Sequence, residues 1–84
     1  MKVGMEFAPR ELVAERLVKG REERGVSQQD IATELHVSQP TVCSWENAGR
    51  MPERDRWTAI AKAYGFPSME ELFFVVPADQ AAGG

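Results

Sequence analysis

The sequence is poor in the residues that cross-link small proteins or hold metal ions: it has one cysteine, Cys43, and one histidine, His36. A single cysteine cannot form an internal disulfide, and no further ligand stands at metal-binding spacing. A glycine-rich phosphate loop and a Ser-His-Asp arrangement are also missing, so we expect no metal, no cofactor and no enzymatic activity. Core packing and helix chemistry must therefore hold the fold together.

Long apolar segments are missing as well. The longest, Leu72–Val76, is far shorter than the roughly 18 residues that a membrane-spanning helix needs. Residues 1–9 contain one lysine and no apolar run, and so do not resemble a secretory signal. These absences favour a cytoplasmic protein without a membrane partner.

An excess of positive charge is missing too, because the net charge is -3. This acidity argues at first against nucleic acid, since affinity for DNA comes largely from Lys and Arg side chains that neutralise phosphates. The acidic excess comes from the C-terminal residues Glu70, Glu71 and Asp79, however, and Glu46 is the only carboxylate over residues 36–50. Docking depends on the face that is presented, so the overall charge does not exclude DNA.

The sequence does contain a succession of short helical patterns. Apolar residues recur at helical spacing, and glycine, proline or serine marks the boundaries. We expect an all-α fold, a compact five-helix bundle with helices over residues 10–24, 28–36, 39–47, 57–65 and 68–73. The folded domain is expected over 9–76, with a flexible N-terminal arm at 1–8 and a disordered tail at 77–84.

Serine residues stand where three of these helices begin. Ser27 is followed three residues later by Asp30, although a strict capping box has Glu or Gln there. Ser68 and Glu71 form a complete capping box ahead of the fifth helix. Ser38 caps the third helix, so the second and third helices meet across a turn of about three residues. A turn this short forces a steep crossing, which is typical of a helix-turn-helix.

From about Val13 to Phe73 the chain resembles the Xre/Cro-type repressors of bacteria and phages. The resemblance is carried by Arg21–Ala32 (REERGVSQQDIA), Val37-Ser38, Val42, Trp45-Glu46 and Leu72-Phe73. It implies a lambda repressor-like fold and a sequence-specific regulator of transcription, expected to be a repressor. Such a regulator would act as a homodimer on double-stranded DNA, at an inverted-repeat operator with half-sites about 34 Å apart.

The resemblance implies a role for each end of the third helix. Its first turn would enter the major groove, and the candidate base readers are Ser38, Gln39, Pro40, Thr41 and Ser44. Gln39 is the best specificity determinant, because an amide can donate to and accept from adenine at once. The expected phosphate contacts are Ser27, Gln28, Asn47, Arg50 and Arg54. Helix capping is the alternative role for Ser27 and Ser38.

The resemblance also implies an ion pair between Arg21 and Glu46 that fixes the angle of the third helix. The alternative is that both are solvated, where such a pair contributes ~0 to 1 kcal/mol. Three residues depart from the family pattern. His36 stands where glycine is usual, and a left-handed backbone strains other residues. Gly20 replaces a large apolar residue, which should weaken the first helix, and Pro40 replaces a residue that often touches bases.

The apolar run Phe73, Phe74, Val75 and Val76 is open to two interpretations: it covers the core, or it forms a dimer or partner surface. We favour a mixture of the two, because the run is apolar on every side. The second interpretation and the net acidity support an alternative function. The chain would then be an antitoxin or a protein-interaction module that uses the same fold with an apolar C-terminal surface. Failure to bind duplex DNA at low salt would favour that alternative.

Overall fold

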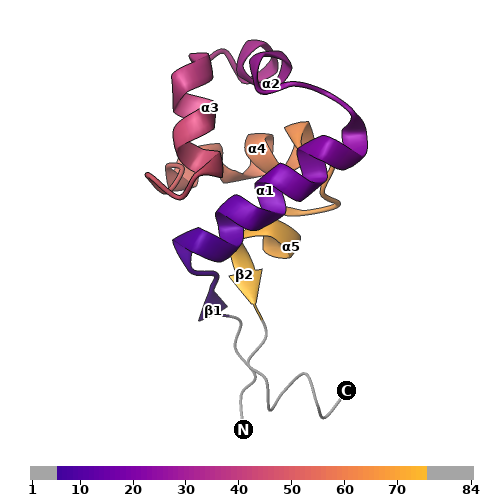
Figure 1. The fold of residues 1–84 in the computed structure, drawn as a ribbon. Coiled ribbons are helices and arrows are strands. Elements are labelled where there is room, and N and C mark those ends of the chain that lie inside the picture. The colour runs from indigo at the N-terminus through magenta and orange to yellow at the C-terminus, as the bar shows by residue number, and fades with distance from the viewer. Residues whose placement is uncertain (1–5, 76–84) are drawn as a thin grey trace, which may run out of the picture.

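The computed structural model describes residues 6–75, which form five α-helices and a short two-stranded sheet (Figure 1). The helices are α1 (Arg10–Arg24), α2 (Gln28–Leu35), α3 (Gln39–Glu46), α4 (Trp57–Ala63) and α5 (Met69–Phe73), and the 3-10 turn η1 (Arg54–Arg56) precedes α4. Strands β1 (Glu6–Phe7) and β2 (Phe74–Val75) pair antiparallel at the end of the domain opposite α2. The expected helical bundle is confirmed. Over these described residues, no helix has the length and apolar character that a bilayer crossing requires.

Residues in the left-handed conformation end the first two helices. Gly25 closes α1 with a φ of 71°, and His36 closes α2 with a φ of 59°. The Val37 N–H then donates to the Ala32 carbonyl oxygen at 3.0 Å, so one of the last carbonyl groups of α2 finds a partner. The turn therefore keeps its shape with histidine in the glycine position.

The two predicted capping boxes have different outcomes. Before α2, the Ser27 hydroxyl accepts from the Asp30 N–H and the Asp30 carboxylate accepts from the Ser27 N–H, both at 3.0 Å. The bond from the Ser27 backbone lowers the pKa of Asp30. Before α5, the Ser68 side chain makes no capping bond. The predicted box is wrong there, because the Glu71 N–H donates to the Ser68 backbone carbonyl oxygen at 3.2 Å instead.

The apolar faces of the helices meet in one core. Gly20 of α1 is part of it: a Cβ atom there would lie 2.8 Å from the Phe66 ring and 3.0 Å from the Tyr64 carbonyl oxygen. Phe66 therefore fills the space of the large side chain that Gly20 lacks. Fully buried side chains come from every helix, among them Leu17, Ile31, Val42, Ile60 and Leu72.

The sheet joins the first and last described residues of the chain. Phe7 lies opposite Phe74, the Ala8 N–H donates to the Phe73 carbonyl oxygen at 2.8 Å, and Ala8 is buried. The expectation of an arm outside the domain is therefore wrong for residues 6–8. The pairing spans nearly the whole chain, so no local pattern indicates it. Residues 1–5, Val76 and the predicted tail at 77–84 lie outside the described part of the chain.

Arg16 of α1 fastens the C-terminal end of α5. Its Nη1 atom donates to the carbonyl oxygens of Glu71, Leu72 and Phe74, at 3.0, 3.1 and 2.9 Å. Carbonyl groups at a helix end have no partner within the helix, so this guanidinium satisfies groups that would otherwise need water. The contact ties the start of β2 to the longest helix.

Phe73 belongs to the core and not to a partner surface, which corrects the prediction for this residue. It has no exposed surface, and its ring stacks on Trp57 with the centroids 4.2 Å apart. Phe74 is half-buried in β2, and its ring centroid lies 5.0 Å from that of Phe7. We call Phe7, Trp57, Phe73 and Phe74 the aromatic cluster. Its outermost member, Phe7, is 54% exposed.

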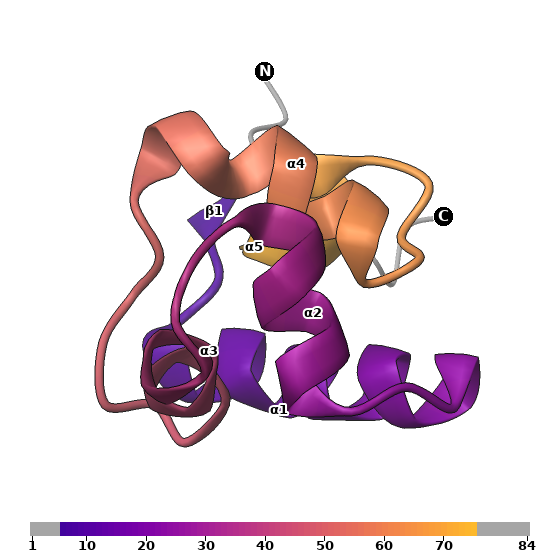
Figure 2. The same cartoon turned by 90° about the horizontal axis from the view of Figure 1, so that it is seen from above.

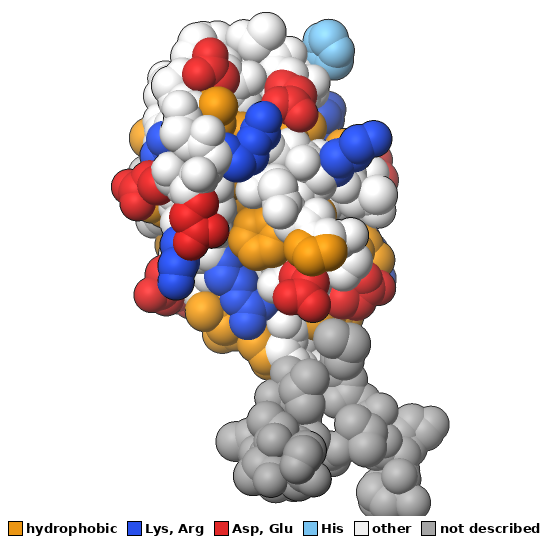
Figure 3. All heavy atoms as spheres, turned by 90° about the vertical axis from the view of Figure 1, so that its right-hand side faces the viewer, with side chains coloured by type: hydrophobic (Ala, Val, Ile, Leu, Met, Phe, Trp, Pro, Cys, Tyr) orange, Lys and Arg blue, Asp and Glu red, His pale blue; other side chains and the backbone are white. Residues whose placement is uncertain are grey.

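The surface on the side away from α3 carries charges of both signs. Figure 3 shows this face, where acidic and basic side chains lie next to one another around a small apolar area. A mixed pattern of this kind is ordinary for a solvated surface and does not attract an anion over a wide area. The distribution of charge therefore gives no reason to place a nucleic-acid partner on this face.

Candidate nucleic-acid interface

Helices α2 and α3 pack closely across the turn at residues 36–38. Figure 2 looks nearly along α3, with α2 running across it, so the two helices cross steeply. Ala32, on the face of α2 that packs inward, has no exposed surface, so a larger side chain there would have no room. The close packing of two short helices holds α3 at the edge of the domain.

One side of α3 anchors the helix and the other faces outward. Val42, Trp45 and Glu46 are buried. The five predicted base readers are all at least partly accessible: Ser38 and Pro40 are exposed, and Gln39, Thr41 and Ser44 are half-buried. Ser38 also caps the helix, since its hydroxyl accepts from the Thr41 N–H at 3.3 Å and lies 2.8 Å from the Thr41 hydroxyl.

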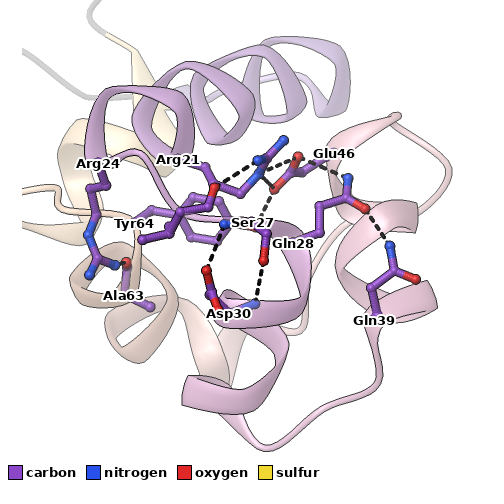
Figure 4. A network of polar contacts seen from close by, with 10 residues as sticks. Arg21, Arg24, Ser27, Gln28, Asp30, Gln39, Glu46, Ala63 and Tyr64 are labelled. Carbon is purple, nitrogen blue, oxygen red and sulfur yellow. Dashed lines mark hydrogen bonds and ion pairs between the residues drawn. The ribbon is translucent and has the colours of Figure 1, made fainter.

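Glu46 is a buried carboxylate with three side-chain partners (Figure 4). Arg21 donates to both of its oxygens, at 2.8 and 3.0 Å, so the Arg21–Glu46 pair expected from the resemblance is formed. The Tyr64 hydroxyl donates to Glu46 at 2.8 Å, and the Gln28 amide donates at 3.1 Å. The Glu46 side chain is only 2% exposed, so the interpretation as a solvated pair is wrong.

This burial changes the protonation chemistry of two partners of Glu46. The hydrogen bond to Glu46 raises the pKa of Arg21, whose charge is thereby kept. Burial, and then the hydrogen bond to Glu46, raises the pKa of the Tyr64 hydroxyl, which stays a donor. Buried charge is tolerated only where such partners satisfy it. The arrangement therefore locks α1, α3 and the end of α4 together.

Gln28 connects this buried network to the predicted reader Gln39 (Figure 4). A carboxylate only accepts hydrogen bonds, so the Gln28 amide nitrogen must face Glu46. The Gln28 amide oxygen then faces Gln39, whose Nε2 atom donates to it at 2.6 Å. Gln39 is left with its amide oxygen and one N–H for other partners. The buried Glu46 carboxylate thus sets the orientation of the Gln28 amide, and the Gln28 amide sets that of Gln39.

The turn after α3 is held by its own backbone and side chains. Ala48 adopts the left-handed conformation with a φ of 64°, and the N–H groups of Gly49 and Arg50 donate to the Ser44 carbonyl oxygen. The Asn47 amide oxygen accepts from Gly49 at 2.9 Å. A Cβ atom on Gly49 would lie 2.8 Å from that oxygen, so a larger residue there would displace the Asn47 side chain. The turn presents Arg50 beside α3, exposed to solvent.

Arg54, the other arginine predicted to contact phosphate, lies elsewhere. Its guanidinium carbon stands 4.7 Å from the centroid of the Phe7 ring and 5.3 Å from that of Trp57, at the aromatic cluster. Arg56 instead shares a hollow with Arg50 next to the first turn of α3. Sequence reasoning missed Arg56, Tyr64 and the contact between Gln28 and Gln39, because each depends on how distant segments pack.

Metal-binding groups are not part of this arrangement. Cys43 is half-buried on α3, and no cluster of His, Cys, Asp and Glu side chains suited to a metal ion occurs within residues 6–75.

Comparison with known proteins agrees with this geometry. The helix-turn-helix family matches residues 17–72 of the chain. Two solved structures resemble it over nearly its full length. The clp gene regulator ClgR from C. glutamicum has 21% sequence identity and a TM-score of 0.68, with 90% of this chain and 91% of that chain covered. The hypothetical transcription factor NHTF from Neisseria has 17% identity and a TM-score of 0.72, with 99% and 98% covered. No curated protein matches the sequence.

Proposed function

This chain belongs to the helix-turn-helix family of DNA-binding transcription regulators, and we propose that it reads the major groove with the first turn of α3. The groove admits one α-helix, and α3 is a short helix at the edge of the domain with its outer side accessible. Its only carboxylate, Glu46, is buried and paired with Arg21. No charge on the helix itself therefore repels the phosphates on either side of the groove.

The observation that carries this proposal is the orientation of the Gln39 amide. Its nitrogen donates to Gln28, which in turn donates to Glu46, so the amide cannot turn over without breaking a hydrogen bond. The atoms left to Gln39 are one acceptor and one donor. Adenine offers the complementary pair in the major groove, its N6 amino group and its N7 atom. We therefore assign Gln39 to an adenine.

Phosphate contacts on either side of this reader position the domain. Gln28 is the first residue of α2, where free backbone N–H groups and the positive end of the helix favour an anion. The side chains of Ser27 and Asn47 accept hydrogen bonds from nearby backbone N–H groups in the free protein. These bonds hold the conformation of two segments that are candidates for phosphate contact. Arg50 lies beside α3 and supplies an exposed positive charge.

Repression follows if the protein occupies an operator that overlaps a promoter. We propose a homodimer on an inverted repeat, because two copies related by a two-fold axis place two α3 helices about one turn of DNA, ~34 Å, apart. The surface left for a second copy is formed by Phe7, Phe74 and Val75, since Phe73 is buried. The aromatic edge at Phe7 gives this surface its apolar character.

Selection of bound duplexes from a random pool tests the base-reading role. The wild type should enrich one sequence with an adenine at a fixed position in each half-site, and Gln39→Ala should lose the preference at that position alone. Gln29→Ala is the matched control, because Gln29 is exposed on α2 and its side chain donates to Thr33 of the same helix. An adenine preference that persists in Gln39→Ala would remove Gln39 as the reader.

The exposed Phe7 ring supports the alternative function as a protein-interaction module or antitoxin. In that case the wild type would retain no duplex at low salt, where sequence-independent binding is strongest. Binding of any duplex with a steep salt dependence would reject this alternative as the main function.

A further inference from the structure

A hollow of about 270 Å³ lies beside the first turn of α3, apart from the reader Gln39. Its walls come from two segments, the start of α3 and the stretch from the turn after α3 to η1. The polar residues that line it are Ser38, Thr41, Arg50, Glu53 and Arg56, and Val37 and Trp45 complete the lining. Two arginines and two residues with hydroxyl groups thus line one small space.

The charges in this hollow do not cancel. Arg56 has a distant partner in Glu53, with 3.8 Å between Nε and the nearer carboxylate oxygen, and both side chains are largely exposed. Arg50 has no ion-pair partner among the described residues. The hollow therefore carries one positive charge in excess, which fits an anion of a single charge.

We infer that this hollow binds one phosphodiester of the DNA backbone, with Arg50 and Arg56 as its two cations. The inference rests on the proposed function and adds Arg56, which that function does not include. A phosphodiester carries one negative charge, whereas a phosphate monoester carries about 1.5 to 2 and would stay partly unneutralised. Guanidinium groups and hydroxyl groups are the usual donors to backbone phosphates.

Two earlier assignments change as a result. Ser38 and Thr41 face the hollow and contact each other, so they act on the phosphate and not on bases. Base reading is then left to Gln39, Pro40 and Ser44. Arg54 has no part in binding, because its guanidinium lies over the aromatic cluster.

The salt dependence of affinity for the selected duplex tests this inference. Arg56→Gln should lower the slope of log K against log salt by about 0.9 per protomer, which is roughly an eightfold loss at 0.1 M salt. Glu53→Gln should bind about two- to fivefold more tightly, because Arg56 loses a competing carboxylate. Lys62→Gln is the control: Lys62 is exposed on α4, away from the hollow, and its slope should not change.

Arg54→Gln distinguishes the two arginines that flank Asp55. Its slope should equal that of the wild type. A wild-type slope in Arg56→Gln, or an equal loss in Arg54→Gln, would overturn the inference while the proposed function stands. If the wild type binds no duplex at all, both fail. Circular dichroism and thermal unfolding of each variant establish that it is folded.

Neutral methylphosphonates introduced one at a time along the selected duplex locate the contact. One position should weaken the wild type and should weaken Arg56→Gln less, since one of the two cations that meet this phosphate is already gone. A free anion is the other source of the same chemistry, and amide NMR shifts during titration with inorganic phosphate test it. Saturation of residues 38, 41, 50 and 56 below millimolar phosphate would assign the hollow to a free anion and overturn the inference.

Discussion

The two ends of the domain are stabilised by different kinds of contact. Near α3, a chain of directed hydrogen bonds runs from Tyr64 through Glu46 and Gln28 to Gln39. At the opposite end, the side chains of the aromatic cluster are held by ring packing, and the hydrogen bonds there fix backbone groups, such as that from the Trp57 indole to the Pro52 carbonyl oxygen at 2.9 Å. The contacts near α3 depend on the orientation of polar groups, and those of the aromatic cluster depend on buried volume.

This difference separates binding from stability. A hydrogen-bond chain specifies which atom of Gln39 faces outward, yet each neutral bond contributes only about 1 kcal/mol net. Ring burial contributes several times more but does not specify the orientation of a polar atom. We therefore expect substitutions in the aromatic cluster to act mainly on unfolding, and substitutions in the hydrogen-bond chain to act on DNA recognition as well.

Truncation of Phe73 should give the largest effect. Phe73→Ala removes a fully buried ring from its stack with Trp57 and should lower the free energy of unfolding by about 3–5 kcal/mol. Denaturant unfolding followed by circular dichroism measures this loss. Phe7→Ala is the control, because the Phe7 ring is more than half exposed and should cost much less. Equal losses in both variants would contradict the division between buried core and surface edge.

Removal of one hydroxyl tests the other end of the domain. Tyr64→Phe leaves the buried Glu46 without one donor and should cost about 1.5–3 kcal/mol, the range for hydrogen bonds to charged groups. Because Glu46 also receives the Gln28 amide, this variant should relax the adenine preference of Gln39. Denaturant unfolding and duplex selection provide the two readouts. Loss of stability with an unchanged base preference would show that the chain does not orient Gln39.

The same hydroxyl makes stability depend on pH in alkaline solution. Burial raises the pKa of Tyr64 above its ordinary value near 10. The group therefore stabilises the folded state below pH ~10, and this contribution falls as the pH rises further, by up to about 1.4 kcal/mol per pH unit. The unfolding free energy of the wild type should fall more steeply above pH 10 than that of Tyr64→Phe. Parallel curves would contradict this assignment.

Substitution of Gly20 tests how sensitive stability is to added side-chain volume away from α3 and from the aromatic cluster. Gly20→Ala should lower the unfolding free energy by about 1–2 kcal/mol, because the added Cβ would press on the Phe66 ring and on the Tyr64 carbonyl oxygen. Phe66→Leu in the same chain should recover part of this loss, since removal of the ring leaves room for the added Cβ. Thermal unfolding of the single and double variants gives the coupling. Two additive losses would mean that Phe66 does not fill the site.

The two serine caps should give the smallest difference. Ser27→Ala should cost about 1 kcal/mol, whereas Ser68→Ala should be nearly neutral, because only Ser27 makes a capping bond. Matched thermal unfolding of the two variants measures the difference. A loss in Ser68→Ala as large as that in Ser27→Ala would show that Ser68 caps α5 in solution.

Local patterns in the sequence predicted most of the helical frame. The five helices and the cap at Ser27 each depend on residues a few positions apart. Helix ends and helical faces are short-range properties, because backbone hydrogen bonds and side-chain spacing repeat every few residues. The family resemblance supplied the Arg21–Glu46 pair, which residue spacing alone does not indicate.

The remaining features depended on contacts between distant segments. Three features arise only when segments far apart in the sequence meet. They are the pairing of β1 with β2, the hydrogen bond from Tyr64 to Glu46, and the separate positions of Arg54 and Arg56. Arg54 and Arg56 are two residues apart and equally basic, so their sequence cannot separate them. Only the packed structure decides which guanidinium meets a ring and which meets the hollow beside α3, because that choice depends on what each side chain finds across the fold.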